Sequence, residues 1–210
     1  MSGAGAVIGA SDHYGRAELV TLAVEDGAAV FLDRRRVALI DKGLPIAPYH
    51  HEAPALDIGP ATALVNQVRR SVAQHARSAI LTVLKTYRAG VLILPASPYQ
   101  GLPDSLEEVL NSRPLTLAAD GMLYRESLAD TAAQLGLEVR RYSRKIDQAA
   151  LAAKAMGVES DQVTALLDQF GRVAGPPWRK DHKMAAAAAL SVLGPQIRFL
   201  TPLPRDGAPV

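Results

Sequence analysis

The chain has 210 residues, of which 49% are hydrophobic, enough apolar material for one large domain with its own core. It holds no cysteine, which excludes disulfide bridges and thiolate metal sites and is typical of a cytoplasmic protein. Its net charge of +2 is too small to indicate nucleic-acid binding by itself, and no apolar run reaches the roughly 20 residues of a membrane span, so we expect no membrane association.

The first 40 residues predict three antiparallel strands. Short apolar runs cover residues 6–10 and 19–24, and the second run leads into Asp26 and Gly27. An Asp-Gly pair between apolar runs favours a hairpin, so a third strand should follow from residue 29. The arginines at 34–36 suit either a strand edge protected by charge or a phosphate-binding clamp.

A proline-rich connector and a long helix come next. Residues 41–60 contain four prolines and predict no regular element. Residues 60–87 carry apolar side chains at three- and four-residue spacing, which predicts a helix with one buried stripe. The short apolar run at 90–95 indicates a strand buried on both faces, and therefore a central one.

The second half alternates helices with one more strand, expected at residues 137–142. The predicted helices cover residues 105–111, 118–135, 146–156, 161–170 and 181–193. Asp104 and Ser160 are the expected N-caps of two of them. Residues 1–194 should form a single domain, and the proline-rich residues 195–210 an irregular tail.

This order of elements, three strands followed by alternating helices and strands, implies a mixed α/β sheet with helices on both faces. It resembles the ribonuclease H-like fold of RuvC-type Holliday-junction resolvases, transposases and actin-like ATPases. Residues 7–12 look like the first strand of the resolvases, in which an apolar run and a glycine precede a catalytic Asp. Residues 181–190 look like their final helix, which begins with an Asp and continues with small residues packed on the sheet.

The chain also resembles a bacterial protein family of unassigned function. The shared motifs are residues 34–36 with 49–52, residues 120–126, and Gly-Pro-Pro-Trp at 175–178 followed by Asp181 and Lys183. This second resemblance supports the fold and marks the start of the last helix as a place of interest. It implies no reaction.

The resemblance to resolvases implies two Mg or Mn ions held by three or four carboxylates, which activate a water and stabilise the leaving oxygen. Asp12 would supply the first carboxylate and Asp181 the last. The strand that should carry another acid ends in residues 94–98 without one, so Asp120 or Glu126 would have to replace it. The ordinary alternatives are a turn residue for Asp12 and helix capping for Asp120 and Asp181.

Two groups of residues are candidates for binding nucleic acid. They are Trp178, Arg179 and Lys180 near the last helix, and Arg69, Arg70 and Arg77 in the long helix. A helix start with cations beside it favours anions, and Lys183 would be a catalytic partner of Asp181 there. Trp178 either stacks on a base or fills a gap between two helices. Residues 58–103 lack any acid, which suits either a phosphate-binding surface or a solvated helix face.

Other sites and classes have little support. The adjacent His50 and His51 would point to opposite sides of an extended segment, so a loop packed by Tyr49 is expected there rather than a metal site. Phosphate-loop, dinucleotide and nucleophile-elbow motifs are absent. Two functions lead: a metal-dependent nuclease acting on structured nucleic acid, or an inactive module of the same fold that binds nucleic acid or a protein. An actin-like nucleotide binder lacks its glycine-rich hairpins, and a homodimer is compatible with either function.

Overall fold

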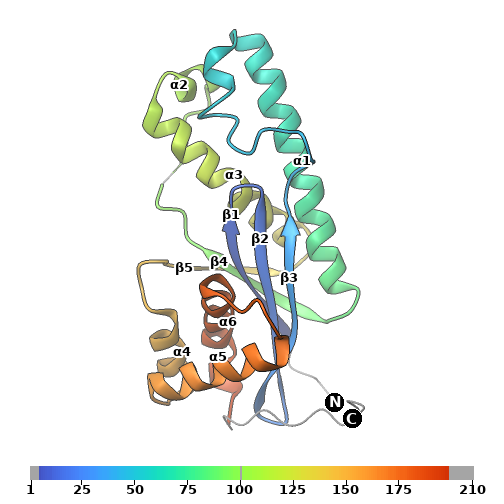
Figure 1. Cartoon of the computed structure of the whole chain (residues 1–210), viewed down its shortest axis with the longest axis vertical. Helices are drawn as coiled ribbons and strands as arrows, with labels where there is room; N and C mark the ends of the chain where they lie inside the picture. The colour runs from blue at the N-terminus through green and yellow to red at the C-terminus, as the bar shows by residue number, and fades with distance from the viewer. Residues whose placement is uncertain (1–4, 100, 199–210) are drawn as a thin grey trace.

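A computed structural model describes residues 5–99 and 101–198, which form one five-stranded sheet with helices on both faces (Figure 1). The strands lie in the order β3-β2-β1-β4-β5, and β1 to β3 are antiparallel while β4 and β5 run parallel to β1. Their bounds are β1 Ala6–His13, β2 Arg16–Glu25, β3 Ala28–Ala38, β4 Ala89–Pro95 and β5 Glu138–Tyr142. The predicted mixed sheet and the inner position of β4 are confirmed.

The predicted hairpin joins β2 to β3 through Asp26 and Gly27, whose φ angles are +49° and +82°. β3 is longer than the apolar pattern suggested, because its backbone stays paired with β2 through the polar residues 33–36. Arg36 lies opposite Glu18 in this ladder and binds its carboxylate. Charge pairing across the strands therefore extends β3 beyond its apolar residues.

The helices form one layer on each face of the sheet (Figure 1). Their bounds are α1 Ile58–Leu84, α2 Leu106–Leu110, α3 Arg113–Gln134, α4 Gln148–Met156, α5 Ser160–Ala174 and α6 Lys180–Leu193. The helices α1 and α3 pack on one face, and α4, α5 and α6 on the other. None of the helices within the described residues is long and apolar enough to cross a membrane.

Several predicted helix starts are wrong. Ser105, rather than Asp104, caps α2, because its hydroxyl accepts the N–H of Glu108 at 3.3 Å. Glu159 precedes α5 in the cap position, which leaves Ser160 as the first helical residue. Both errors are shifts of a single residue. Neighbouring polar residues are alternative caps, and the sequence alone does not show which of them caps the helix.

Larger differences occur in the connector and in α3. A short 3-10 helix, η1 Ala53–Ala55, forms within the proline-rich connector, where no regular element was expected. α3 begins at Arg113, five residues earlier than predicted, with Pro114 in its first turn, a position that suits proline. Asp120 therefore lies inside the helix. The short helix η2 Gly194–Gln196 opens the predicted tail, and residues 199–210 of that tail lie outside the described part.

The small residues of α6 bring this helix very close to β1. All five alanines at 185–189 are buried, as the resemblance to a resolvase helix predicted. Gly9 of β1 lies directly under the helix, and a Cβ atom at this position would sit only 2.0 Å from the carbonyl oxygen of Ala185. This contact fixes the start of α6 beside the carboxyl end of β1.

Candidate functional site

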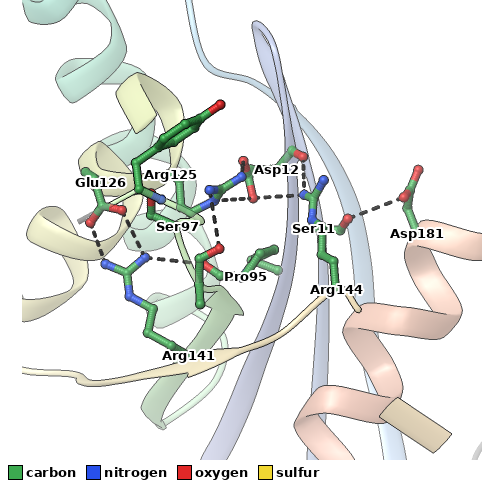
Figure 2. Close-up of polar contacts among 12 residues, drawn as sticks. Ser11, Asp12, Pro95, Ser97, Arg125, Glu126, Arg141, Arg144 and Asp181 are labelled. Atoms are coloured by element: carbon green, nitrogen blue, oxygen red, sulfur yellow. Dashed lines mark hydrogen bonds and ion pairs between the residues drawn. The ribbon is translucent and has the colours of Figure 1, made fainter. Parts of the chain in front are cut away.

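The carboxyl ends of the parallel strands β1, β4 and β5 meet at one edge of the sheet, between α3 and α6 (Figure 2). In open α/β sheets, ligands bind in the crevice outside such strand ends. Asp12 comes to this edge from β1, Arg125 from α3, Arg144 from the segment after β5, and Asp181 from the first turn of α6.

Asp12 is held by two arginines. Its carboxylate is 5% exposed, and it accepts Nε of Arg125 at 3.2 Å and Nη2 of the same residue at 3.1 Å. Arg144 donates from Nη2 to Oδ1 at 3.0 Å and also to the main-chain oxygen of Asp12. Such charge-assisted, bidentate contacts are strong, and they balance the charge of Asp12 with groups of the protein itself.

Asp181 lies at the same sheet edge but on the other face. Successive residues of a strand point to opposite faces, so Ser11 and His13 face α6 while Asp12 faces α3. Ser11 donates its hydroxyl to Oδ1 of Asp181 at 3.4 Å, and Nε2 of His13 lies 3.0 Å from Oδ2, at an angle that makes no hydrogen bond. Arg179 takes the cap position of α6, so the capping role considered for Asp181 is wrong.

Asp120 anchors the connector loop. Its fully buried carboxylate accepts the main-chain N–H groups of Tyr49 at 3.1 Å and His50 at 2.9 Å. Burial raises the pKa of Asp120 to about 6, although both N–H groups oppose the rise. Its position inside α3 also rules out the predicted capping of a helix end. Tyr49 is buried and packs the loop onto the helices, as predicted.

The four candidate acids do not fit a two-metal site. Glu126 pairs with Arg141, with 2.6 Å between Oε2 and Nη2 (Figure 2). Asp12 is paired with arginines, and Asp120 binds the connector. Asp181 lies beside Ser11 and His13. The described residues contain no group of three or more His, Asp or Glu side chains that could hold a metal ion.

Contrary to expectation, Lys183 is not paired with Asp181. Its Nζ lies 2.7 Å from Oδ1 of Asp168 in α5, so its ion pair joins two helices and does not involve Asp181.

Residues 175–183 mainly dock the α5–α6 turn onto the sheet. Arg34 of β3 donates to the carbonyl oxygens of Gly175 and of the two prolines that follow. The buried His182 accepts the N–H of Arg179 at Nδ1, 3.0 Å away, and donates from Nε2 to Glu18 at 3.0 Å. Burial lowers the pKa of His182, which favours this neutral form. Residue spacing in the sequence did not reveal these contacts between distant positions.

Trp178 fills a gap in this docked turn. Its ring stacks on His182 with centroids 5.6 Å apart and meets the edge of Phe31 at 5.9 Å. Gly171 of α5 leaves room for the ring, because a Cβ atom there would lie 2.5 Å from Cδ1 of Trp178. The structure thus gives Trp178 the packing role that was one of its two interpretations.

The six predicted nucleic-acid residues fall on two faces. Arg69, Arg70 and Arg77 are exposed on α1, and Arg69 donates to the hydroxyl of Tyr49 at 2.7 Å. Arg179 and Lys180 are exposed at the start of α6, on the other face. Two further exposed cations lie beside the latter pair. We define the carboxyl-end surface as Arg144, Lys145, Arg179 and Lys180.

Comparison with known proteins supports the fold. No protein-family model and no curated protein sequence matches the chain. Among solved structures, RuvC of Thermus thermophilus matches with a TM-score of 0.52 and 13% identity, over 89% of this chain and 91% of RuvC. The same protein in complex with a Holliday junction substrate matches with a TM-score of 0.51 and 16% identity, over 89% and 90%. The chain therefore has the ribonuclease H-like fold in the form found in RuvC.

Proposed function

We propose that this chain is a RuvC-like module that binds structured nucleic acid, with branched DNA as the first candidate, and does not cleave it by two-metal catalysis. The observation that carries the proposal is the capture of Asp12 by Arg125 and Arg144 at the carboxyl end of β1.

Two-metal cleavage needs carboxylate oxygens that are free to hold ions about 3.5–4 Å apart. The guanidinium groups of Arg125 and Arg144 already supply positive charge to the Asp12 carboxylate from within the chain. Metal binding at Asp12 would have to displace at least one of these groups. Displacing Arg125 would leave its side chain, which is 9% exposed, without its carboxylate partner, and that arrangement is costly.

Nucleic-acid binding is supported by the cations at this edge. The carboxyl-end surface presents four exposed basic residues next to the strand ends. Lys and Arg side chains bind the phosphate backbone, which dominates the affinity of proteins for nucleic acid. A RuvC structure of the same fold is described in complex with a Holliday junction, which makes branched DNA the natural first probe.

Fluorescence anisotropy with labelled four-way junction, duplex and single-stranded DNA tests the proposal over a series of salt concentrations. We expect salt-sensitive binding that is tightest for the junction. The triple variant Lys145→Ala/Arg179→Ala/Lys180→Ala should bind more weakly to every probe. It should also reduce the slope of log K against log salt by about 2–3, since each lost phosphate contact contributes about 0.9.

Lys154→Ala is the matched control, because Lys154 is an exposed lysine of α4 outside this surface. A second triple variant, Arg69→Ala/Arg70→Ala/Arg77→Ala, tests the surface on α1. The proposal fails if none of the nucleic acids binds. The assignment to the carboxyl-end surface fails if only the α1 variant weakens binding.

A further inference from the structure

A depression of about 380 Å³ lies between α4, α5 and α6, and it shares Arg144, Lys145 and Lys180 with the carboxyl-end surface. Small-molecule sites commonly measure about 300–1,000 Å³. We propose that this depression binds a nucleotide, with the phosphate on Lys145 and Lys180 and the base over the apolar floor. The inference does not rest on the proposed function, because nucleotide binding can be measured without any nucleic acid.

Positive charge dominates the lining of the depression. Among the residues that the structure describes, its charged residues are Arg144, Lys145, Lys180, Lys183 and the single acid Asp147. Arg144 and Lys183 already have carboxylate partners, and Asp147 caps α4 by accepting the N–H of Ala149 at 2.9 Å. Lys145 and Lys180 have no ion-pair partner among residues 5–99 and 101–198. These two ammonium groups are therefore available to an anion.

Gln148 provides a second and independent indication of a ligand. This residue lines the depression and is only 5% exposed. Its Nε2 donates to the carbonyl oxygens of Ser143 at 2.8 Å and Ile146 at 2.9 Å, which fixes the orientation of the amide. Its Oε1 is buried and accepts no hydrogen bond from the described part of the chain. An unsatisfied buried acceptor destabilises the fold, and a ligand N–H or O–H group would satisfy it.

Apart from Thr164, the rest of the lining is apolar. Leu167, Met184 and Ala187 come from α5 and α6, and Ile146 at the rim is 52% exposed although it is hydrophobic. Such a floor suits a flat ring, and methionine adapts well to aromatic groups. A ligand that fits has an anionic end, a planar apolar body and a hydrogen-bond donor. A nucleotide combines these three features.

Isothermal titration calorimetry with the full chain tests the inference, using nucleoside monophosphates, ribose 5-phosphate and sulfate as separate probes. At least one nucleoside monophosphate should bind about tenfold or more tightly than ribose 5-phosphate and sulfate, because only it offers both the base and the phosphate. Lys145→Ala and Lys180→Ala should each weaken that binding about tenfold or more, as expected for a charged hydrogen bond. Lys154→Ala should leave it unchanged.

Three results would overturn the inference: no binding of any nucleoside monophosphate, sulfate binding as tightly as the best nucleotide, or no effect of either lysine variant. Competition with oligonucleotides then separates the two sources of such a ligand. Displacement by a 5′-phosphorylated strand, but not by the same strand with a 5′-hydroxyl, identifies a terminal nucleotide of nucleic acid. Displacement by neither identifies a free nucleotide. Equal displacement by both would show that the phosphate backbone of nucleic acid and the nucleotide compete for Lys145 and Lys180, which the depression shares with the carboxyl-end surface.

Discussion

Replacing Asp12 by asparagine distinguishes a structural carboxylate from a metal-binding one through the sign of the stability change. Carboxylates gathered to hold metal ions repel one another when the metal is removed, so neutralising one of them stabilises such a protein. In this chain the Asp12 carboxylate is paired with Arg125 and Arg144. Asp12→Asn should therefore destabilise the chain.

The structure sets the size of this effect. The side chains of Asp12 and Arg125 are 5% and 9% exposed, and breaking a buried pair of this kind costs about 3–5 kcal/mol. The side chain of Arg144 is 37% exposed, so its contact adds at most about 1 kcal/mol after solvent screening. For a chain of this size, the loss of both contacts lowers the melting temperature by roughly 6–24 °C.

Urea unfolding and calorimetry, both in the presence of a chelator, provide the measurement. Asp181→Asn is the control at the same sheet edge. Asp181 is one-third exposed and accepts one long hydrogen bond, so this variant should change stability by less than about 1 kcal/mol. The double variant Asp12→Asn/Arg125→Met should be more stable than the sum of the single variants predicts, because it leaves no buried unpaired guanidinium. A neutral or stabilising Asp12→Asn would refute the structural role of this carboxylate.

Two further predictions concern buried positions. Because the pKa of Asp120 is about 6 in the folded chain and near 4 when unfolded, folding favours its protonated form, and stability should fall by on the order of 3 kcal/mol as pH rises from about 4 to 6. Urea titrations across this range should show a smaller fall in Asp120→Asn, and identical pH profiles of the two proteins would contradict the assignment. Gly9→Ala should cost about 1–3 kcal/mol or more, because its Cβ would meet the backbone of α6, whereas Gly90→Ala in β4 meets open space and serves as the control. Equal melting temperatures for these two variants would show that α6 can move away from β1.

The fold could be predicted from the sequence because its signals are local. Three local patterns each predict the structure of the residues around them: the Asp26-Gly27 turn, the apolar run of β4 and the alanines of α6. Their order along the chain then leaves few possible topologies. The helix starts were less accurate, because adjacent polar residues such as Ser105 and Asp104 are equally acceptable caps by composition.

The candidate site could be located from the sequence, but its chemistry could not. The motif residues Asp12 and Asp181 do reach the same sheet edge, yet the alternation of β1 turns Ser11, and not Asp12, towards Asp181. The partners of Asp12 lie 113 and 132 positions further along the chain. Arg125 belongs to the motif at residues 120–126, which gave no indication of this pairing, and Arg144 lies in a segment without a motif. Contacts between residues so far apart in the sequence depend on how the helices and strands pack. This packing cannot be predicted from a single sequence.

The fate of a four-way DNA junction bound by the protein tests most directly whether the chain binds branched DNA without cleaving it. Labelled junction is incubated with the full chain and Mg or Mn, or with a chelator, and its strands are then separated on a denaturing gel while anisotropy monitors binding. We expect salt-sensitive binding, with every strand recovered at full length under all conditions. Strand cleavage that requires the metal ion and disappears in Asp12→Asn would contradict this expectation.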